Sequence, residues 1–393
     1  MSAMPPVHLP FELTHPLQPA PVESELRARG PIHPVRTAVG DAAWLVTGYK
    51  EVRELLDDDR LGRSHPDPAN ASRTGESAVF GGPMGNFDTE RIDNSRMRGL
   101  LRPHFTRGRM RALIPHVEEL TRDLLDRLDQ RTPPADLVEA LALPLPIAVI
   151  CALLGVPYED RERFRAWSQA AADKHDRARS EQGLAELFEY GRELVARKSR
   201  EPGDDVLSRL AGTDGVSADE AAMMGMFLLF AGHETTVVAI GFGVLMLLAE
   251  PEQWRAVHAD PGLLDSVVEE TLRARVGNGD GIPRYARSDL EVAGVPVRAG
   301  DLVLLDIRAA NHDESVFANS ADFDVTRQPA DHLSFGHGAR YCIGAPLARI
   351  ELRAVLAQLI PRFPDMRLAT RVEELTINRS ALTGGLTSLP VTW

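Results

Sequence analysis

The chain has 393 residues, of which 44% are hydrophobic and 26% are charged. This composition is that of a folded globular protein, and it excludes a disordered chain, a collagen and a disulfide scaffold. The formal net charge of −13 argues against nucleic acid as the main partner, because neutralising phosphates requires clustered positive charge.

The N-terminal part of the chain predicts coil, short strands and one long loop. The first 60 residues combine Pro-rich coil with strand-like pieces such as Trp44–Thr47. The N-terminal segment 1–20 has neither a basic start nor an apolar run, so we expect no signal peptide and no membrane anchor. Residues 64–88 are rich in Ser, Gly, Pro and Asn, and they predict a loop long enough to be functional or disordered.

The rest of the chain is predicted to be mostly helical, with a small β part. The pattern from about Asp93 to Arg275 is helical, and residues 277–307 alternate and are Gly-rich, which predicts short strands and turns. Residues 318–341 predict a loop, and a helix resumes after Cys342. No repeat and no linker divides the chain, so we predict one mainly α domain over residues 1–393.

One apolar stretch, Ala221–Ala249, is long enough to span a bilayer. Its centre carries His233 and Glu234, and its immediate flanks are acidic rather than basic. Ionisable groups are costly inside a membrane. We therefore predict a long helix through the core of a protein with no membrane span, beginning at Ser217.

Two cysteines, Cys151 and Cys342, lie far apart, and no C-x-x-C is present. This pattern fits a reducing, cytoplasmic environment. Cys151 lies in an apolar helical segment and is predicted to be a small buried hydrophobe. Cys342 follows a Gly-rich loop and precedes a helix, whose free N–H groups would favour a thiolate. A lone thiolate of this kind suits a haem iron.

The run Phe335–Gly344, FGHGARYCIG, resembles the haem-binding loop of the cytochrome P450 family, F-G-x-G-x-R-x-C-x-G. Residues 231–236, AGHETT, are similar to the family's A/G-G-x-D/E-T-T, and Glu270 and Arg273 match its E-x-x-R. The resemblance covers nearly the whole chain. It implies a mainly α fold with a small β part and a long central helix over a haem, here haem b (iron protoporphyrin IX) with Cys342 as the iron ligand.

The acid and the alcohol of the long helix suggest oxygen activation. Ala231 and Thr235 lie one turn apart on one helix face, and their small size leaves a notch. The Thr235 hydroxyl beside that notch could bind dioxygen, and Glu234 could connect it to solvent as a proton source. The alternative for Thr235 is a hydrogen bond back to a helix carbonyl. His233-Glu234 is not a zinc site, because Val237 stands where H-E-x-x-H needs a second histidine.

Other residues are assigned by the resemblance to the cofactor or to the fold. Glu270 and Arg273 can pair at i, i+3, and with Arg327 they are expected to form a buried structural network behind the haem. The haem propionates need cationic partners. The residues expected at the cofactor are Asn94, Arg98, Arg284, Phe335, Gly336, Arg340 and Gly344.

The predicted reaction is insertion of one oxygen atom from O2 into an organic small molecule, by hydroxylation or epoxidation, in secondary-metabolite biosynthesis. The residues expected to contact the substrate are Phe227, Phe230, Ala231, Val276 and Ile282, and the loop 64–88 is expected to shape the rest of the site. The alternatives are a haem-thiolate enzyme of oxidative coupling and a non-catalytic haem protein that binds a ligand.

Electrons are expected from NAD(P)H through separate partners, a ferredoxin and its reductase. The chain ends about fifty residues after Cys342, where we expect no fused reductase. Arg102, His104, Arg107 and Arg109 form a candidate basic patch for docking the electron carrier.

Overall fold

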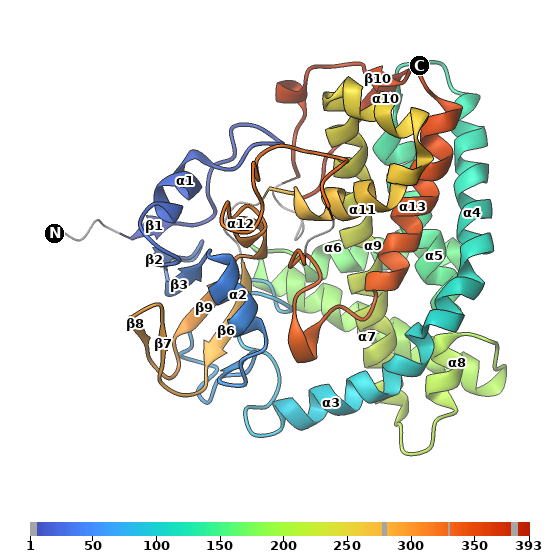
Figure 1. Ribbon diagram of the computed structural model, residues 1–393. Helices are drawn as coiled ribbons and strands as arrows, with labels where there is room; N and C mark the ends of the chain where they lie inside the picture. The colour runs from blue at the N-terminus through green and yellow to red at the C-terminus, as the bar shows by residue number, and fades with distance from the viewer. Residues whose placement is uncertain (1–5, 277–280, 329–330, 379–383) are drawn as a thin grey trace. The chain divides into compact units, whose positions relative to one another are not determined.

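The computed structural model describes residues 6–276, 281–328, 331–378 and 384–393 (Figure 1). In it the chain divides into two compact units. The first unit contains Met1–Asn94 and Glu269–Cys342, and the second contains Ser95–Val268 and Ile343–Trp393.

The first unit is built on a six-stranded sheet with the order β1-β2-β3-β9-β6-β4. The strands of this sheet are β1 (Val7–His8), β2 (Ile32–Arg36), β3 (Ala42–Val46), β9 (Leu302–Leu305), β6 (Ile282–Ala286) and β4 (Leu61–Gly62). A two-stranded hairpin adds β7 (Leu290–Val292) and β8 (Val295–Val297). The short strands predicted within residues 277–307 are therefore confirmed, with 277–280 outside the described residues.

The sheet of the first unit has a hydrophobic core on each face. Val303 and Leu305 of β9 join one cluster, whereas Leu302 and Leu304 join the other, because successive side chains of a strand point to opposite faces. In the antiparallel pairing of β6 with β9, Arg284 lies opposite Val303. Arg284 therefore shares the face of Val303, and this register places a buried arginine on the sheet.

The first unit also contains short helices between its strands and before Cys342. They are α1 (Pro21–Arg27), α2 (Tyr49–Leu56), α12 (Ile307–Ala310) and the 3-10 turn η5 (Gly338–Arg340). Two longer helices, α3 (Glu90–Leu101) and α11 (Leu264–Arg273), contain two of the three points at which the chain passes from one unit to the other; the third lies between Cys342 and Ile343.

The second unit is mostly helical. Its α-helices are α4 (Arg107–Asp129), α5 (Pro144–Leu154), α6 (Arg161–Ala171), α7 (Arg177–Arg200), α8 (Val206–Ala211), α9 (Ala218–Ala249), α10 (Pro251–Ala259) and α13 (Ala345–Arg362). The shorter turns are η1 (Arg102–Phe105), η2 (Val138–Ala142), η3 (Tyr158–Asp160), η4 (Pro261–Leu263) and η6 (Val372–Glu374). A three-stranded sheet, β10-β11-β5, consists of Arg367–Leu368, Pro390–Thr392 and Ala135–Asp136.

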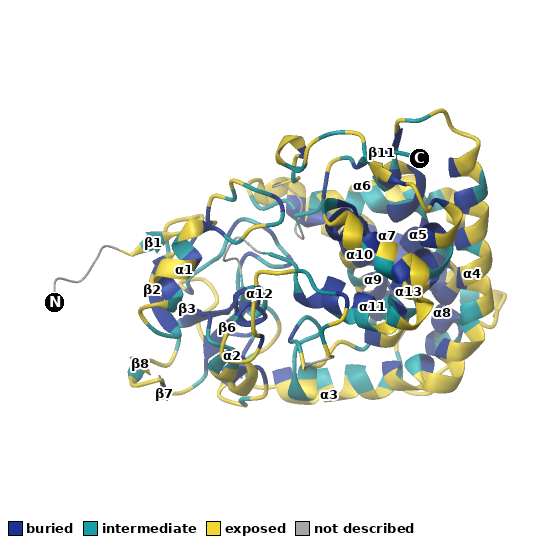
Figure 2. Ribbon diagram, turned by 45° about the horizontal axis from the view of Figure 1, so that its top comes forward, coloured by how far each residue is buried: buried dark blue, intermediate teal, exposed yellow. Residues whose placement is uncertain are grey.

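The core of the second unit forms around α9, which packs against α5, α7 and α13. The Ser217 side chain caps this helix by accepting a hydrogen bond from Glu220 N at 3.1 Å, which confirms the predicted start. By length and composition α9 could cross a membrane, but 72% of its most apolar window is buried inside the protein. Figure 2 shows buried residues along α5 and α9, whereas α4 carries an exposed side. This distribution is that of a core helix.

Candidate functional site

Cys342 lies at the end of a tight loop in the first unit. Gly336 and Gly338 adopt φ angles of 71° and 67°, the left-handed region that favours glycine. The backbone folds back on itself, because Gly336 N donates to Leu333 O at 2.7 Å and Cys342 N donates to Phe335 O at 2.8 Å. Cys342 is exposed, and α13 begins three residues later at Ala345, with Gly344 as its N-cap residue. The loop therefore presents a thiol outside regular structure.

Asn311 anchors the beginning of this loop. Its side-chain oxygen accepts a hydrogen bond from Leu333 N at 2.7 Å, and its side-chain nitrogen donates to Ser334 Oγ at 2.8 Å. Ser334 Oγ in turn donates to Leu272 O on α11 at 2.8 Å. These bonds tie the cysteine loop to the C-terminal end of α11, which carries the E-x-x-R residues.

Glu270 and Arg273 form the ion pair that their spacing predicts. Arg273 Nε and Nη2 reach Glu270 Oε2 and Oε1 at 2.8 and 2.7 Å, and both side chains are 2% exposed. Arg327 Nε binds the same carboxylate at 3.1 Å. Arg273 also donates to Asn311 O at 3.0 Å, so the network continues to the residue that anchors the cysteine loop. Its geometry suits a structural role.

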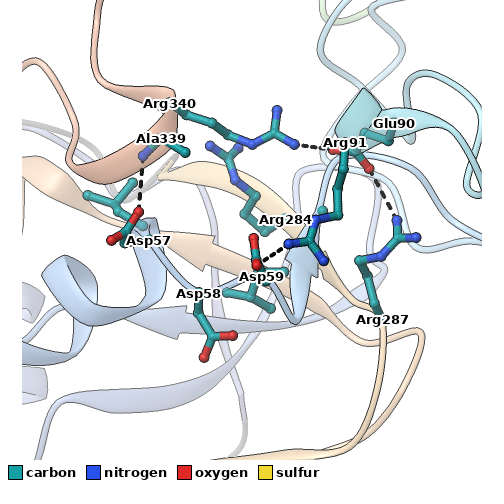
Figure 3. Close-up of a pocket in the computed structure, with 12 residues that line it drawn as sticks. Asp57, Asp58, Asp59, Glu90, Arg91, Arg284, Arg287, Ala339 and Arg340 are labelled. Atoms are coloured by element: carbon teal, nitrogen blue, oxygen red, sulfur yellow. Dashed lines mark hydrogen bonds and ion pairs between the residues drawn. The ribbon is translucent and has the colours of Figure 1, made fainter. Parts of the chain in front are cut away.

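Arg284 and Arg340 lie together in the first unit (Figure 3). Arg284 rises from β6 and is buried, and among the described residues no carboxylate pairs with it; its side chain donates to Pro283 O at 2.8 Å. Burial, together with the charges of Arg63 and Arg340, lowers the pKa of Arg284 to about 9. Because a buried unpaired cation is costly, this position favours an anion.

These residues fit the cofactor that the cysteine loop implies. A haem-thiolate centre needs one cysteine ligand and cationic partners for two carboxylates, and the first unit carries Cys342, Arg284 and Arg340. The buried guanidinium of Arg284 with no carboxylate partner in the described chain is the observation that carries this fit. Phe335 and Gly336 lie within the same loop.

The central residues of α9 form a row on one side of the helix. Phe227, Ala231 and Thr235 are spaced four residues apart; Phe227 and Thr235 are exposed, and Ala231 is intermediate. Thr235 Oγ1 donates to Ala231 O at 3.0 Å, which is the back-bonded geometry stated above as the alternative for this residue. That bond uses the hydroxyl proton and leaves the oxygen as an acceptor. Glu234 is partly exposed.

Two residues beside this row, Phe230 and His233, have different surroundings. Phe230 is buried at 7% exposure, so it does not share the exposed row of Phe227. His233 is buried, and its Nδ1 lies 2.7 Å from Leu229 O. Burial lowers the pKa of His233, which favours the neutral ring.

The other predicted residues lie on α3, on either side of residues 277–280, and in the loop 64–88. Asn94 and Arg98 are both partly exposed and stand four residues apart on α3, so they share one face of that helix. Val276 and Ile282 are partly buried, and the residues between them, 277–280, lie outside the described part of the chain. The loop 64–88 contains only turns and bends, as predicted.

The basic patch is smaller than predicted. Arg102, Arg107 and Arg109 are exposed, but His104 is 7% exposed within the turn η1 and cannot contribute to a surface. Burial and the charges of Arg109 and Arg209 lower the pKa of His104, so the ring is neutral. Including His104 in the patch was wrong, because alternation of basic residues does not reveal which side of a turn faces inward.

Sequence reasoning also missed Glu90, the acidic centre of the arginine cluster. This side chain is buried and binds Arg340 and Arg287 (Figure 3). It also accepts a hydrogen bond from the backbone N–H of Arg63. Asp57 was missed as well; it accepts a hydrogen bond from Ala339 N in the cysteine loop. Neither acid carries a sequence signal, because each partner is distant along the chain.

Comparisons with known proteins show which family of proteins this chain resembles. A model of the family described as Cytochrome P450 matches residues 165–388. Pentalenolactone synthase of Streptomyces exfoliatus is 43% identical over 394 residues, which covers 98% of each chain. The monooxygenase PikC of Streptomyces venezuelae is 38% identical and covers 95% of this chain and 91% of its own.

Solved structures agree with these relatives. The mycinamicin VIII C21 methyl hydroxylase of Micromonospora griseorubida superimposes with a TM-score of 0.89 at 32% identity, covering 98% of this chain and 100% of its own. The pimaricin epoxidase PimD, a cytochrome P450, gives a TM-score of 0.87 at 37% identity and covers both chains fully. The predicted fold class, mainly α with a small β part, is confirmed.

Proposed function

The chain belongs to the cytochrome P450 family and is a haem-dependent monooxygenase, and we propose that it hydroxylates or epoxidises a small organic molecule in secondary-metabolite biosynthesis. The observation that carries the proposal is that one unit contains both the exposed Cys342, at the end of a loop with two left-handed glycines, and the buried Arg284, which pairs with no carboxylate among the described residues. The hydroxylase and epoxidase among its relatives support the reaction class.

Cys342 is the proposed ligand of haem b. When bound, this group supplies an iron centre at which O2 is activated with the help of the thiolate. Arg284 and Arg340 pair with its propionates from the first unit, and Arg98 and Asn94 contribute from α3. Asn94 carries no charge, so it orients a carboxylate while Arg98 supplies most of the attraction. Gly344 leaves room for the flat ring close to the backbone, Gly336 supplies the backbone angle that the loop needs, and Phe335 contacts the ring from the same loop.

The residues of α9 handle oxygen and protons in this proposal. The Thr235 hydroxyl, whose own proton is donated to Ala231 O, accepts a hydrogen bond on the exposed side of the helix and so orients a proton donor there. Glu234, one residue away, exchanges protons with solvent. Phe227, Phe230, Ala231, Val276 and Ile282 contact the substrate and exclude water from the reacting atoms.

Electrons reach the enzyme from NAD(P)H through a ferredoxin and a ferredoxin reductase. Arg102, Arg107 and Arg109 are the exposed cations that suit an acidic carrier, although the whole chain is acidic. We place the protein in the cytoplasm and treat residues 1–393 as one functional haem domain made of the two compact units.

The ligand assignment is tested by the carbon monoxide spectrum of the reduced protein. Cys342→Ala should abolish the red-shifted band that a thiolate ligand produces. Cys151→Ser is the matched control, because Cys151 is buried and burial raises the pKa of its thiol to about 12, so it should retain the band. Persistence of the band in Cys342→Ala would overturn the assignment. Product analysis with candidate substrates separates oxygen insertion from oxidative coupling.

A further inference from the structure

Glu90 is the acid at the centre of an arginine cluster. Four arginines surround it: Arg63, Arg284, Arg287 and Arg340. Glu90 is 8% exposed. One buried carboxylate among four guanidinium groups leaves an excess of positive charge, which suits the two carboxylates of a haem.

Every acceptor position of Glu90 is used. Oε1 accepts from Arg340 Nη2 at 2.5 Å and from Arg63 N at 2.8 Å. Oε2 accepts from Ser64 N at 3.0 Å and, in a short bond, from Ser64 Oγ, with Arg287 Nη1 at 3.4 Å. Burial alone would raise the pKa of Glu90, but the bonds from Ser64 and the backbone, with the charge of Arg340, lower it. The acid is therefore ionised and held in one orientation.

The partners of Glu90 are not equivalent. Arg287 stacks on the Phe87 ring, 3.9 Å from its centroid, and donates to Phe87 O at 2.6 Å. Phe87 therefore holds the Arg287 side chain in place independently of Glu90. Arg340 lies at the end of η5, two residues before Cys342, and Glu90 is its ion-pair partner. Figure 3 shows Arg340 reaching Glu90 with one end of its guanidinium while Arg284 stands beside it. Because Glu90 fixes one end of the Arg340 guanidinium, it determines which N–H groups of that guanidinium remain for a ligand.

We infer that Glu90 is a positioning residue for the cofactor: it holds Arg340 beside Arg284 so that both guanidinium groups address the same propionate. This inference rests on the proposed function, which places the propionates at these two arginines. Two effects of Glu90 oppose each other. Its negative charge weakens the attraction of the cluster for a carboxylate, whereas its hydrogen bonds remove the freedom of Arg340. The orienting effect of Glu90 on Arg340 is larger than the loss of attraction, because removing Glu90 leaves several buried donors without an acceptor.

The test measures transfer of haem from the ferric holoprotein to apomyoglobin. Glu90→Gln places an amide N–H among donors, and it should speed haem loss about tenfold, the equivalent of one charge-assisted hydrogen bond. Glu90→Asp keeps the charge and should recover most of the parent rate. Asp59→Asn is the matched control: Asp59 lines one pocket with Glu90, Arg284 and Arg340, but it is 69% exposed and pairs with Arg91, so its rate should stay at the parent value. Slower or unchanged haem loss in Glu90→Gln would overturn the inference.

A double-mutant cycle with Arg340→Leu separates positioning from general stability. If Glu90 acts through Arg340, Glu90→Gln should change haem loss by less than about twofold in the Arg340→Leu background. A full additional increase there would show that Glu90 only stabilises the fold. If Arg340→Leu alone leaves haem loss unchanged, the propionate assignment fails instead. Should Glu90→Gln yield no holoprotein, Glu90→Asp takes its place in the same cycle. The inference is then contradicted if Glu90→Asp still changes the rate of haem loss in the Arg340→Leu background.

Discussion

Asp57 binds the backbone of Ala339 in the cysteine loop: its Oδ1 accepts a hydrogen bond from Ala339 N at 3.0 Å. Asp57 is the C-cap residue of α2, so this contact ties the sheet region of the first unit to the turn that precedes Cys342. A Cβ atom at Gly338 would meet Asp57 Oδ1 at 1.8 Å and Asp57 Cβ at 2.6 Å. The close approach of Asp57 therefore requires a glycine at position 338.

Gly338→Ala should lower haem incorporation and stability more than Gly336→Ala does. Both glycines have a positive φ, so both alanines pay a left-handed penalty of about 1–2 kcal/mol. Only at Gly338 does the new methyl also displace Asp57; at Gly336 the nearest atom that the methyl would meet is Arg340 O, at 3.9 Å. Haem content and thermal unfolding measure the difference. Equal losses in the two variants would show that conformation alone, and not Asp57, constrains the loop.

Glu270→Ala should prevent accumulation of haem-loaded protein. Removing one partner of a buried ion pair costs roughly 3–5 kcal/mol, and Arg273 would be left 2% exposed beside Arg327. Arg298→Ala is the control, because its ion pair with Asp289 has side chains 69% and 61% exposed and should contribute little. Yield and haem spectrum of the two variants are compared; a normal holoprotein from Glu270→Ala contradicts a structural role for the network.

The difference between Glu270 and Glu90 shows which contacts of the site could be predicted from the sequence. Glu270 and Arg273 are three residues apart on a helix, so local geometry predicts their contact. Glu90 and Arg340 are 250 residues apart, and no local pattern joins them. The cysteine loop could be predicted for the same local reason, because its glycines and its cysteine lie within ten residues.

The long helix α9 shows a second limit of sequence reasoning. Its existence and its start at Ser217 follow from an apolar run and a capping residue. Its orientation does not, because the helix is apolar on all sides and periodicity gives no preferred face. Phe227 and Phe230 are equivalent in sequence, yet Phe227 is exposed and Phe230 is buried. Only packing against the neighbouring helices of the second unit distinguishes them.

Acid should destabilise the protein through His312. Burial first, then the charges of Arg273 and Arg27, lower the pKa of His312 from 6.5 to about 4. The unfolded chain therefore binds one more proton between these values, so this stabilisation is complete above pH 6.5 and is lost as the pH falls toward 4. The full effect is about 3 kcal/mol.

The check compares urea unfolding of the parent and His312→Gln at about pH 7.5 and about pH 5. Other titrating groups are common to both proteins, so the difference between them isolates His312. The stability of the parent should fall more between the two pH values than that of the variant. The same fall in both proteins would mean that His312 is protonated in the folded state at low pH.

Thr235→Ala should uncouple electron consumption from product formation. Thr235 lies on the exposed side of α9, and its hydroxyl donates to Ala231 O, which leaves its oxygen as a fixed acceptor that orients a proton donor there. With alanine the enzyme should still oxidise NAD(P)H but release more hydrogen peroxide and less product. Thr235→Ser keeps the hydroxyl and should restore coupling. Thr236→Val is the matched control, because Thr236 makes the same type of bond, to Gly232 O at 3.5 Å, but is 4% exposed. Normal coupling in Thr235→Ala, or equal uncoupling in Thr236→Val, would assign Thr235 to helix structure alone.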